Sequence, residues 1–323
     1  MRVLEIDHAS YAVHPIHRDE ERMWPETNCY VDLWIELLHA LRLEPLAAMG
    51  FTLALDWEGD QFTFFKFPLE DLEELFGIET LELQVWRPLP DAIRTQVRQG
   101  RPVIVEVDSF HLPDTRGVSY GVEHVKTSVA VNGIDVANRR LGYFHNRGYH
   151  QLEGRDYDGL FRCGAPADAR ILAPYVEMVK LHRLRRPDAG ALARIAIAQA
   201  RKHLSRRPGQ NPLRAFASSF ARDVEWLGKE PMASFHGYSF ATLRQLGANF
   251  ECAAAFARWL APLAGLDLDA PARAFQDIAA AAKAMQFRLA RVPAGKKYDG
   301  TASLRGMAQG WEEAMASLAG ALG

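Results

Sequence analysis

The feature that most constrains the fold is a change of pattern near residue 180. Up to about residue 175, strand-like apolar runs alternate with helical stretches. Beyond about residue 185, Ala, Leu and Arg dominate, and Pro or Gly separates long helical stretches. A chain of 323 residues is too long for one ordinary domain. We therefore expect an α+β domain over residues 1–180 and an all-α helical domain over residues 181–323.

The first half predicts one main helix followed by a mostly antiparallel sheet. After Cys29, apolar residues recur on one face of a helix. We expect a hairpin over 51–57 and 61–67, short helices over 68–78 and 90–100, and strands over 80–86, 102–110, 124–134 and 139–146. The second half predicts a bundle or cap of helices near 188–206, 212–228, 239–262, 268–291 and 301–321.

The composition restricts the class of protein. No apolar run approaches the roughly 18 residues that span a bilayer, and the first residues lack the layout of a signal peptide. The chain has only three cysteines, Cys29, Cys163 and Cys252, which suits a reducing cytoplasm better than a disulfide framework. A net charge of -2 argues against a dedicated nucleic-acid binder. We expect a cytoplasmic protein that binds neither membranes nor nucleic acids.

Cys29 lies at the predicted start of the main helix. Asn28 is a good N-cap residue, which places Cys29 in the first turn. The unpaired N–H groups and the helix dipole stabilise a thiolate there, and the same N–H groups can form part of an oxyanion hole. The alternative is that Cys29 is a small apolar residue of the core.

A nucleophilic cysteine also requires a base and a group that orients the base. His124 begins a predicted strand, and Asn146 ends the next one. Neighbouring antiparallel strands can bring the two together, so that the Asn146 carbonyl selects the imidazole tautomer, as in Cys-His-Asn sites. His145 is a rival for the orienting role, or a plain strand residue.

Further polar residues follow the strands. Asp108 ends a buried strand and is a candidate site residue, whereas Asp114 is better explained by a turn next to Pro113. Lys126 shares a sheet face with His124 and could meet a substrate carboxylate or pair with an acid.

Two segments of the second half are candidates for binding. Residues 235–260 carry a polar stripe that includes His236, Arg244 and Gln245, which fits the floor of an aminoacyl pocket or the wet face of an amphipathic helix. Residues 182–207 are rich in arginine, with Arg185, Arg186 and Arg206 as candidates for docking an acidic partner. The alternatives there are a solvated helix face or, less well supported, an RNA surface.

The sequence "HPIH" gives only weak support for a metal site. His14 and His17, with His8 as a further one, are the candidates for ligands. No HExxH or paired CxxC motif accompanies them. We therefore expect no metal.

Several of these motifs carry a resemblance to known proteins. Cys29 at the start of a helix, "VEVDSFHLPDT" and "HVKTSVAVNGID" resemble the papain-like domain of butirosin-biosynthesis-type acyltransferases. With "ETNCYVDLWIELLHAL", "GYFHN" and "FHGYSFATLRQLGANFE", the chain also resembles, over nearly its whole length, a bacterial family of unknown function whose members often occur beside amino acid:carrier-protein ligases. The resemblance implies a papain-like fold with a helical C-terminal domain and the catalytic residues Cys29, His124 and Asn146.

The resemblance also implies a reaction. An acyl or aminoacyl group would pass from a carrier-protein thioester to Cys29 and then to a small-molecule amine or thiol. No resident cofactor is implied, because the carrier protein supplies the phosphopantetheine arm.

The chain departs from papain in two respects. The spacing between Cys29 and His124 is 95 residues, against roughly 130 in papain. No Gln precedes Cys29, so we expect Asn28 to be the side-chain oxyanion donor. The alternatives to an acyltransferase are a hydrolase with the same chemistry and a non-catalytic module that binds a carrier protein or an aminoacyl group.

Overall fold

The computed structural model describes residues 1–20, 22–164 and 172–323. The chain forms two compact units, which we describe separately. The sheet unit comprises residues 1–18, 28–45 and 72–186, and the helical unit comprises residues 19–27, 46–71 and 187–323. Two segments of the first half thus pack with the C-terminal helices. The expected division between residues 180 and 181 stays a prediction.

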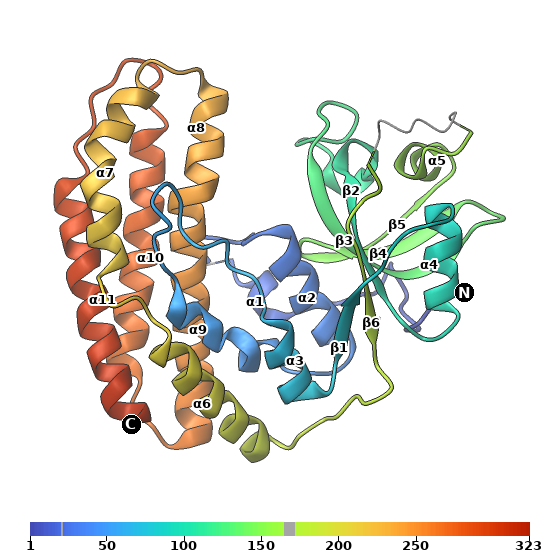
Figure 1. Cartoon of the computed structure of the whole chain (residues 1–323), viewed down its shortest axis with the longest axis horizontal. Helices are drawn as coiled ribbons and strands as arrows, with labels where there is room; N and C mark the ends of the chain where they lie inside the picture. The colour runs from blue at the N-terminus through green and yellow to red at the C-terminus, as the bar shows by residue number, and fades with distance from the viewer. Residues whose placement is uncertain (21, 165–171) are drawn as a thin grey trace. The chain divides into compact units, whose positions relative to one another are not determined.

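The sheet unit is built on six antiparallel strands (Figure 1). Their order across the sheet is β1-β6-β2-β3-β4-β5. The strands are β1 (Glu79–Glu82), β2 (Val103–Asp108), β3 (Lys126–Asp135), β4 (Arg140–His145), β5 (Gly148–Glu153) and β6 (Val176–Lys180). The prediction of an antiparallel sheet region followed by a helical region is therefore confirmed, although the sequence reading omitted β5 and β6.

Helices cover both faces of this sheet: α2 (Cys29–Ala40) lies on one face, and α4 (Leu89–Val97) and α5 (Arg155–Phe161) lie on the other. The short helix α1 (Pro15–Arg18) precedes α2 in the chain, and α3 (Leu69–Phe76) joins the two units in sequence. Val103, Val105 and Val107 share one face and form a core with residues of α4 and α5. The alternate residues of β2 face the other way. Helix α2 packs against β3 and β4 and is buried along most of its length.

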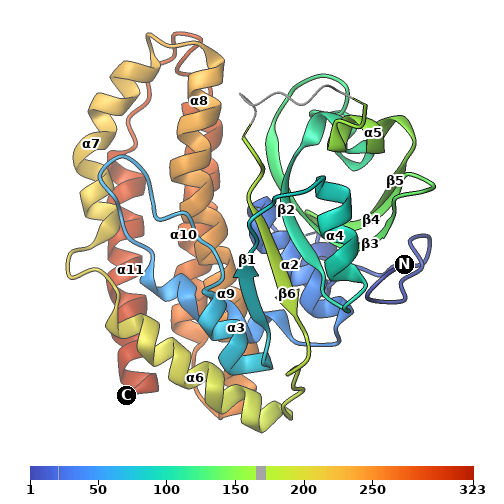
Figure 2. The ribbon, with the colours of Figure 1, turned by 45° about the vertical axis from the view of Figure 1, so that its right-hand side comes forward.

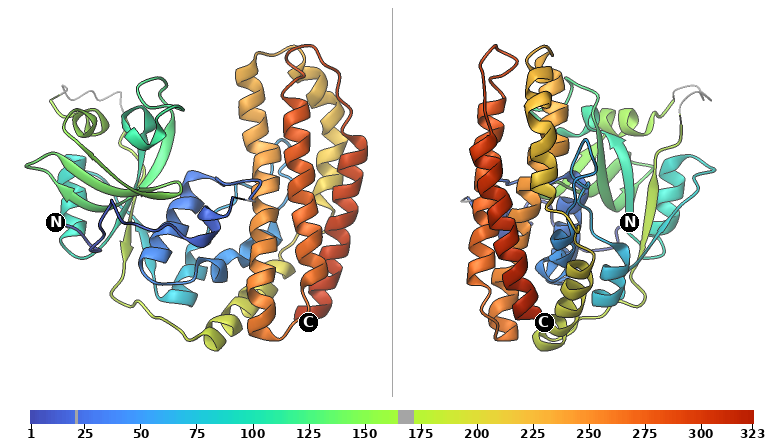
Figure 3. Two further views of the ribbon diagram at one scale, coloured as in Figure 1. Left: turned by 180° about the vertical axis from the view of Figure 1, so that it is seen from behind. Right: turned by 60° about the vertical axis from the view of Figure 1, so that its left-hand side comes forward.

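The helical unit consists mainly of long helices that lie side by side (Figure 3). They are α6 (Ala189–Ser205), α7 (Pro212–Leu227), α8 (Met232–Ser239), α9 (Gln245–Ala264), α10 (Asp269–Leu289) and α11 (Thr301–Leu322), with the 3₁₀ segment η1 (Pro45–Ala54) before them. The ends follow the sequence: the Asp188 side chain caps α6, and Gly265 ends α9 with φ 64°. Among the described helices, none has both the length and the apolarity needed to cross a bilayer.

Two local predictions were wrong. Residues 51–57 and 61–67 do not form a hairpin, because η1 extends to Ala54 and a single bridge joins Trp57 and Phe62. The aromatic rings there pack on Phe216 of α7 instead of on a neighbouring strand. The single helix expected over 239–262 is interrupted by a π-helical turn over Phe240–Arg244. The Ala241 carbonyl in that turn accepts a hydrogen bond from the Phe62 N–H.

A buried polar cluster joins the N-terminal segment to α2. Glu36 accepts hydrogen bonds from the Tyr11 hydroxyl (2.6 Å) and the His14 N–H (3.1 Å), and it lies 2.5 Å from Nδ1 of His17. Nε2 of His17 lies 3.3 Å from Asp32. Burial alone would lower the pKa of His17, but the hydrogen bonds and charges of Asp32 and Glu36 outweigh it and raise that pKa. The cluster therefore favours a charged imidazolium between two carboxylates.

We predict that Glu36→Gln destabilises the protein by about 3 kcal/mol, because one partner of a buried ion pair is lost and the His17 charge stays buried. Denaturant unfolding monitored by circular dichroism measures the change. The exposed i,i+4 pair of Glu225 with Lys229 supplies the control, since water screens such a pair and Glu225→Gln should change the free energy of unfolding far less. Equal effects of the two substitutions would contradict this role of Glu36.

Candidate functional site

Cys29 is the first residue of α2, as the sequence predicted. Asn28 has extended backbone angles (φ −145°, ψ 159°), and its side-chain oxygen accepts a hydrogen bond from the Val31 N–H at 2.9 Å. The half-buried thiol of Cys29 thus lies at the positive end of a capped helix. Because the Asn28 oxygen serves as the cap, only its amide N–H groups could act as the predicted oxyanion donor.

His124 is paired with Asp108. The two lie where β2 ends and β3 is about to begin, and Nδ1 of His124 is 2.5 Å from Oδ2 of Asp108. The imidazole also stacks on the Phe110 ring, with centroids 4.4 Å apart and planes 9° apart. The side chain is 70% exposed, and in the part of the chain that the structure describes no hydrogen bond reaches Nε2. A ring held at Nδ1 and open at Nε2 has the geometry of a general base.

Burial alone would raise the pKa of the Asp108 carboxyl. The hydrogen bonds from His124 and from the Phe110 N–H outweigh this effect and lower that pKa. Asp108 is therefore a carboxylate that can select the tautomer of His124 and stabilise an imidazolium.

Asn146 lies elsewhere in the sheet unit. It occupies the turn between β4 and β5 with φ 45°, a conformation that Asn tolerates better than most residues. The position at Nδ1 of His124 that sequence reasoning reserved for Asn146 is thus occupied by Asp108.

The neighbouring His145 belongs to a separate buried cluster that the sequence reading missed. Its Nδ1 lies 2.5 Å from Asp114, and its Nε2 lies 2.8 Å from the Thr127 hydroxyl. The Tyr143 hydroxyl donates to the same Asp114 carboxylate at 2.5 Å. Asp114, expected only in a turn, therefore ties the loop between Asp108 and His124 to the sheet. The alternation along "GYFH" places Tyr143 and His145 on one face and could have signalled this.

Cys29 and the His124–Asp108 pair lie on the same face of the sheet. The hydroxyl of Tyr30, next to Cys29, donates to Glu177 at 2.7 Å, and Glu177 is paired with Ile104 of β2. Ile104 and Asp108 share a face because side chains alternate along a strand, and four residues span roughly 13 Å. No hydrogen bond between described residues joins the Cys29 sulfur to His124. The start of α2 and the His124–Asp108 pair thus belong to the same face of the sheet, with no hydrogen bond between Cys29 and His124 among the described residues.

The end of β2 lies beside the start of β3 in the sheet (Figure 2). A cavity of ≈ 680 Å³ opens there, beside the pair. Asp108 and His124 line it together with Lys126 and Glu106, and apolar residues such as Leu160 form its walls. Lys126 lies 2.7 Å from Glu106 in an exposed ion pair. Of the two expectations for Lys126, the structure shows the pairing with an acid.

The polar stripe of residues 235–260 contacts the protein backbone. Arg244 donates to the carbonyls of Thr27 (3.0 Å) and Glu26 (3.3 Å), and the Gln245 oxygen accepts from the Phe65 N–H at 3.4 Å. His236 is exposed on α8. The structure therefore gives Arg244 and Gln245 bonds within the helical unit and does not bring them to His236.

The three arginines proposed for docking differ from one another. Arg185 donates to the carbonyls of Glu73 (2.7 Å) and Glu74 (2.9 Å) in the last turn of α3, and Arg186 donates to the Leu41 carbonyl at 3.2 Å. Both therefore stabilise helix C-termini. Arg206 is exposed at the end of α6 and has no ion pair with any described residue.

The histidines considered as metal ligands have other roles. His14 and His17 belong to the Glu36 cluster, and His8 is exposed. Residues 1–20, 22–164 and 172–323 contain no group of three or more His, Cys, Asp or Glu side chains arranged to hold a metal ion.

We predict that Asp108→Ala releases the ring of His124, because the carboxylate at Nδ1 is what selects its tautomer. Long-range ¹H–¹⁵N NMR of the imidazole should change from one tautomer to a mixture. Asp108→Asn, which keeps an acceptor, should retain part of the bias. Glu106→Gln on the same face of β2 should leave the His124 signals unchanged; an unchanged tautomer in Asp108→Ala would show that the contact has no orienting effect.

The comparisons agree with the two-part organisation of the chain. None of the curated proteins compared with the chain matches it. Family models match two long segments, the DUF1839 N-terminal domain over residues 12–181 and the DUF1839 C-terminal domain over residues 189–320. Together they cover nearly the whole sequence, and the chain therefore belongs to the DUF1839 family.

Proposed function

We propose that the protein is a cysteine-dependent acyltransferase with a papain-like sheet unit. The observation that carries the proposal is the His124–Asp108 pair, held at Nδ1 and open at Nε2 beside a cavity. Cys29 at the capped start of α2, on the same face of the sheet, supports it. The catalytic set is then Cys29, His124 and Asp108, with the carboxylate in the place of the expected Asn146.

The reaction has two steps. The Cys29 sulfur attacks the acyl carbonyl of a thioester while its proton passes to Nε2 of His124. The acyl–sulfur bond to the donor breaks, the donor thiolate takes the proton from His124, and an acyl-Cys29 thioester remains. An acceptor amine then attacks this thioester, and its proton returns to the Cys29 sulfur through His124. The N–H groups of the first turn of α2 are donors for the oxyanion in both steps.

The resemblance to butirosin-biosynthesis-type acyltransferases supports a carrier protein as the donor, with an acyl or aminoacyl group on its phosphopantetheine arm. A hydrolase would use the same acyl-Cys29 intermediate and release it to water. One observation favours a second candidate, a non-catalytic carrier-binding module: the Cys29 sulfur and His124 have no hydrogen bond to each other in the described chain. Substrate binding would have to bring the two groups together for the acyltransferase to work.

The chemical prediction distinguishes the enzyme from the binding module. Incubation with an aminoacylated carrier protein should load one acyl group onto Cys29, seen by intact mass, and an added amine should remove it. His124→Ala should slow loading by about 100-fold or more, the share of a general base. Cys29→Ala should abolish loading and keep carrier binding, because the methyl group preserves the shape of the site.

The chain offers matched controls for this experiment. Cys163 is an exposed residue, but partial burial of its sulfur and the charge of the neighbouring Asp158 raise the pKa of its thiol. Cys252 is buried. Iodoacetamide should therefore alkylate Cys29 faster than either at neutral pH. His8→Ala and Cys163→Ala should load normally. Carrier binding without acyl mass on wild-type Cys29 would leave the binding module as the function.

Arg206 tests the docking of an acidic carrier protein. Arg206→Glu should slow association several-fold at low salt, and the loss should shrink as ionic strength rises. Arg206 is preferred for this test, because Arg185→Glu would also remove the hydrogen bonds to the end of α3 and should lower thermal stability. Association rates from surface plasmon resonance that are the same for Arg206→Glu and wild type would assign Arg206 to an ordinary solvated surface.

A further inference from the structure

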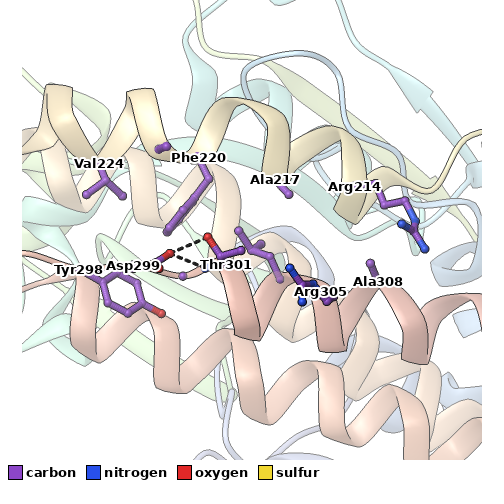
Figure 4. A pocket seen from close by; sticks show the side chains of 12 residues that line it. Arg214, Ala217, Phe220, Val224, Tyr298, Asp299, Thr301, Arg305 and Ala308 are labelled. Carbon is purple, nitrogen blue, oxygen red and sulfur yellow. Dashed lines mark hydrogen bonds between the residues drawn. The ribbon is translucent and has the colours of Figure 1, made fainter.

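A second cavity lies within the helical unit, far along the chain from the residues of the proposed acyl-transfer site. It has a volume of ≈ 480 Å³ and lies between α7 and the N-terminal part of α11 (Figure 4). Phe220 and Val224 of α7 and Leu304 of α11 give it apolar walls. Its size falls within the range of about 300–1,000 Å³ that small-molecule sites occupy.

One cation in this cavity has no counter-charge among the residues that the structure describes. Arg305 lines the cavity from α11, and no ion pair or hydrogen bond connects its guanidinium to any residue that the structure describes. The other lining arginine, Arg214, is already bound to Glu312 through two bonds of 2.9 and 3.2 Å. Arg305 is thus the lining arginine available for an anion. Its planar fork matches a carboxylate with two parallel hydrogen bonds.

A second polar group in the cavity is a buried donor. The Tyr298 hydroxyl is buried among the residues that line the cavity. Burial raises the pKa of Tyr298 and outweighs the hydrogen bonds of Ser303 and Arg288, which lower that pKa. The hydroxyl therefore stays protonated, and its own O–H can donate to a ligand oxygen.

The acidic residue of the cavity is bonded to the start of α11 through one of its oxygens. Asp299 accepts hydrogen bonds from the N–H (2.9 Å) and the hydroxyl (2.6 Å) of Thr301 at the start of α11 (Figure 4). The next residue, Gly300, lies against Phe220, where a Cβ atom would come within 2.6 Å of the ring. The glycine thus keeps the aromatic wall and the start of α11 close together.

We propose that this cavity binds an amphipathic monocarboxylate. The apolar walls take the hydrocarbon part, Arg305 binds the carboxylate, and the Tyr298 hydroxyl donates a further hydrogen bond to it. The site does not involve Cys29 or His124, so an experiment that contradicts one of the two proposals leaves the other unaffected.

The probe is octanoate, titrated into the full-length protein by calorimetry. We expect saturable binding of one octanoate, with octanol and butyrate binding at least about tenfold more weakly, because one lacks the charge and the other lacks most of the apolar contact. Arg305→Met should weaken octanoate about tenfold or more and leave octanol unchanged, whereas Arg305→Lys should retain part of the affinity. Tyr298→Phe should weaken octanoate by a smaller factor.

Three further variants test whether octanoate binds in this cavity and not elsewhere. Ala217→Trp fills the cavity from α7 and should abolish binding, whereas Ser218→Trp, on the same helix but outside the cavity lining, should not. Arg222→Met on α7 is the matched control for loss of an arginine. Circular dichroism of each variant verifies its fold. No saturable octanoate binding to wild type, or equal binding to wild type and Arg305→Met, would overturn the proposal.

Discussion

The buried carboxylate of Glu36 organises the sheet unit. It binds Tyr11, the His14 backbone and His17 at once, and so attaches a segment with little regular structure to the middle of α2. A buried charge of this kind is tolerated only when it is paired and fully hydrogen-bonded. The position of α2, and with it the place of Cys29 at its start, therefore depends on residues that precede it in the chain.

The helical unit uses the same principle. Glu251 of α9 accepts from Arg22 (3.1 Å) and from the backbone N–H groups of Met23 (2.8 Å) and Trp24 (3.2 Å). Arg244 continues the series by binding the carbonyls of the two residues before Asn28. The chain segment that precedes Cys29 is thus held by polar side chains that lie more than 200 residues later in the sequence. These polar residues of the stripe satisfy backbone groups that would otherwise be unpaired.

Some features of the candidate site were predictable from the sequence, and others were not. The start of α2 at Cys29 was predictable because an N-cap acts over three residues, and Asp108 and His124 were recognised as residues at strand ends. Their pairing was not predictable. It depends on the register in which Asp108 faces Lys126 across β2 and β3, and on the loop that folds His124 back onto Phe110. The same holds for His145, whose partners Thr127 and Asp114 lie 18 and 31 residues away.

By itself the sequence determined α2 and the long C-terminal helices, four of the six strands, and the order of a mixed region followed by a helical one. Hydrophobic periodicity and helix capping are local signals, because they depend on residues within one or two helical turns of each other. The tertiary structure alone decided that residues 51–67 are not a hairpin, that residues 19–27 and 46–71 pack with the C-terminal helices, and that Asp108 is the partner of His124. In each case long-range burial and hydrogen bonding of polar groups outweighed local preference, because an unpaired buried group costs more than a local propensity can return.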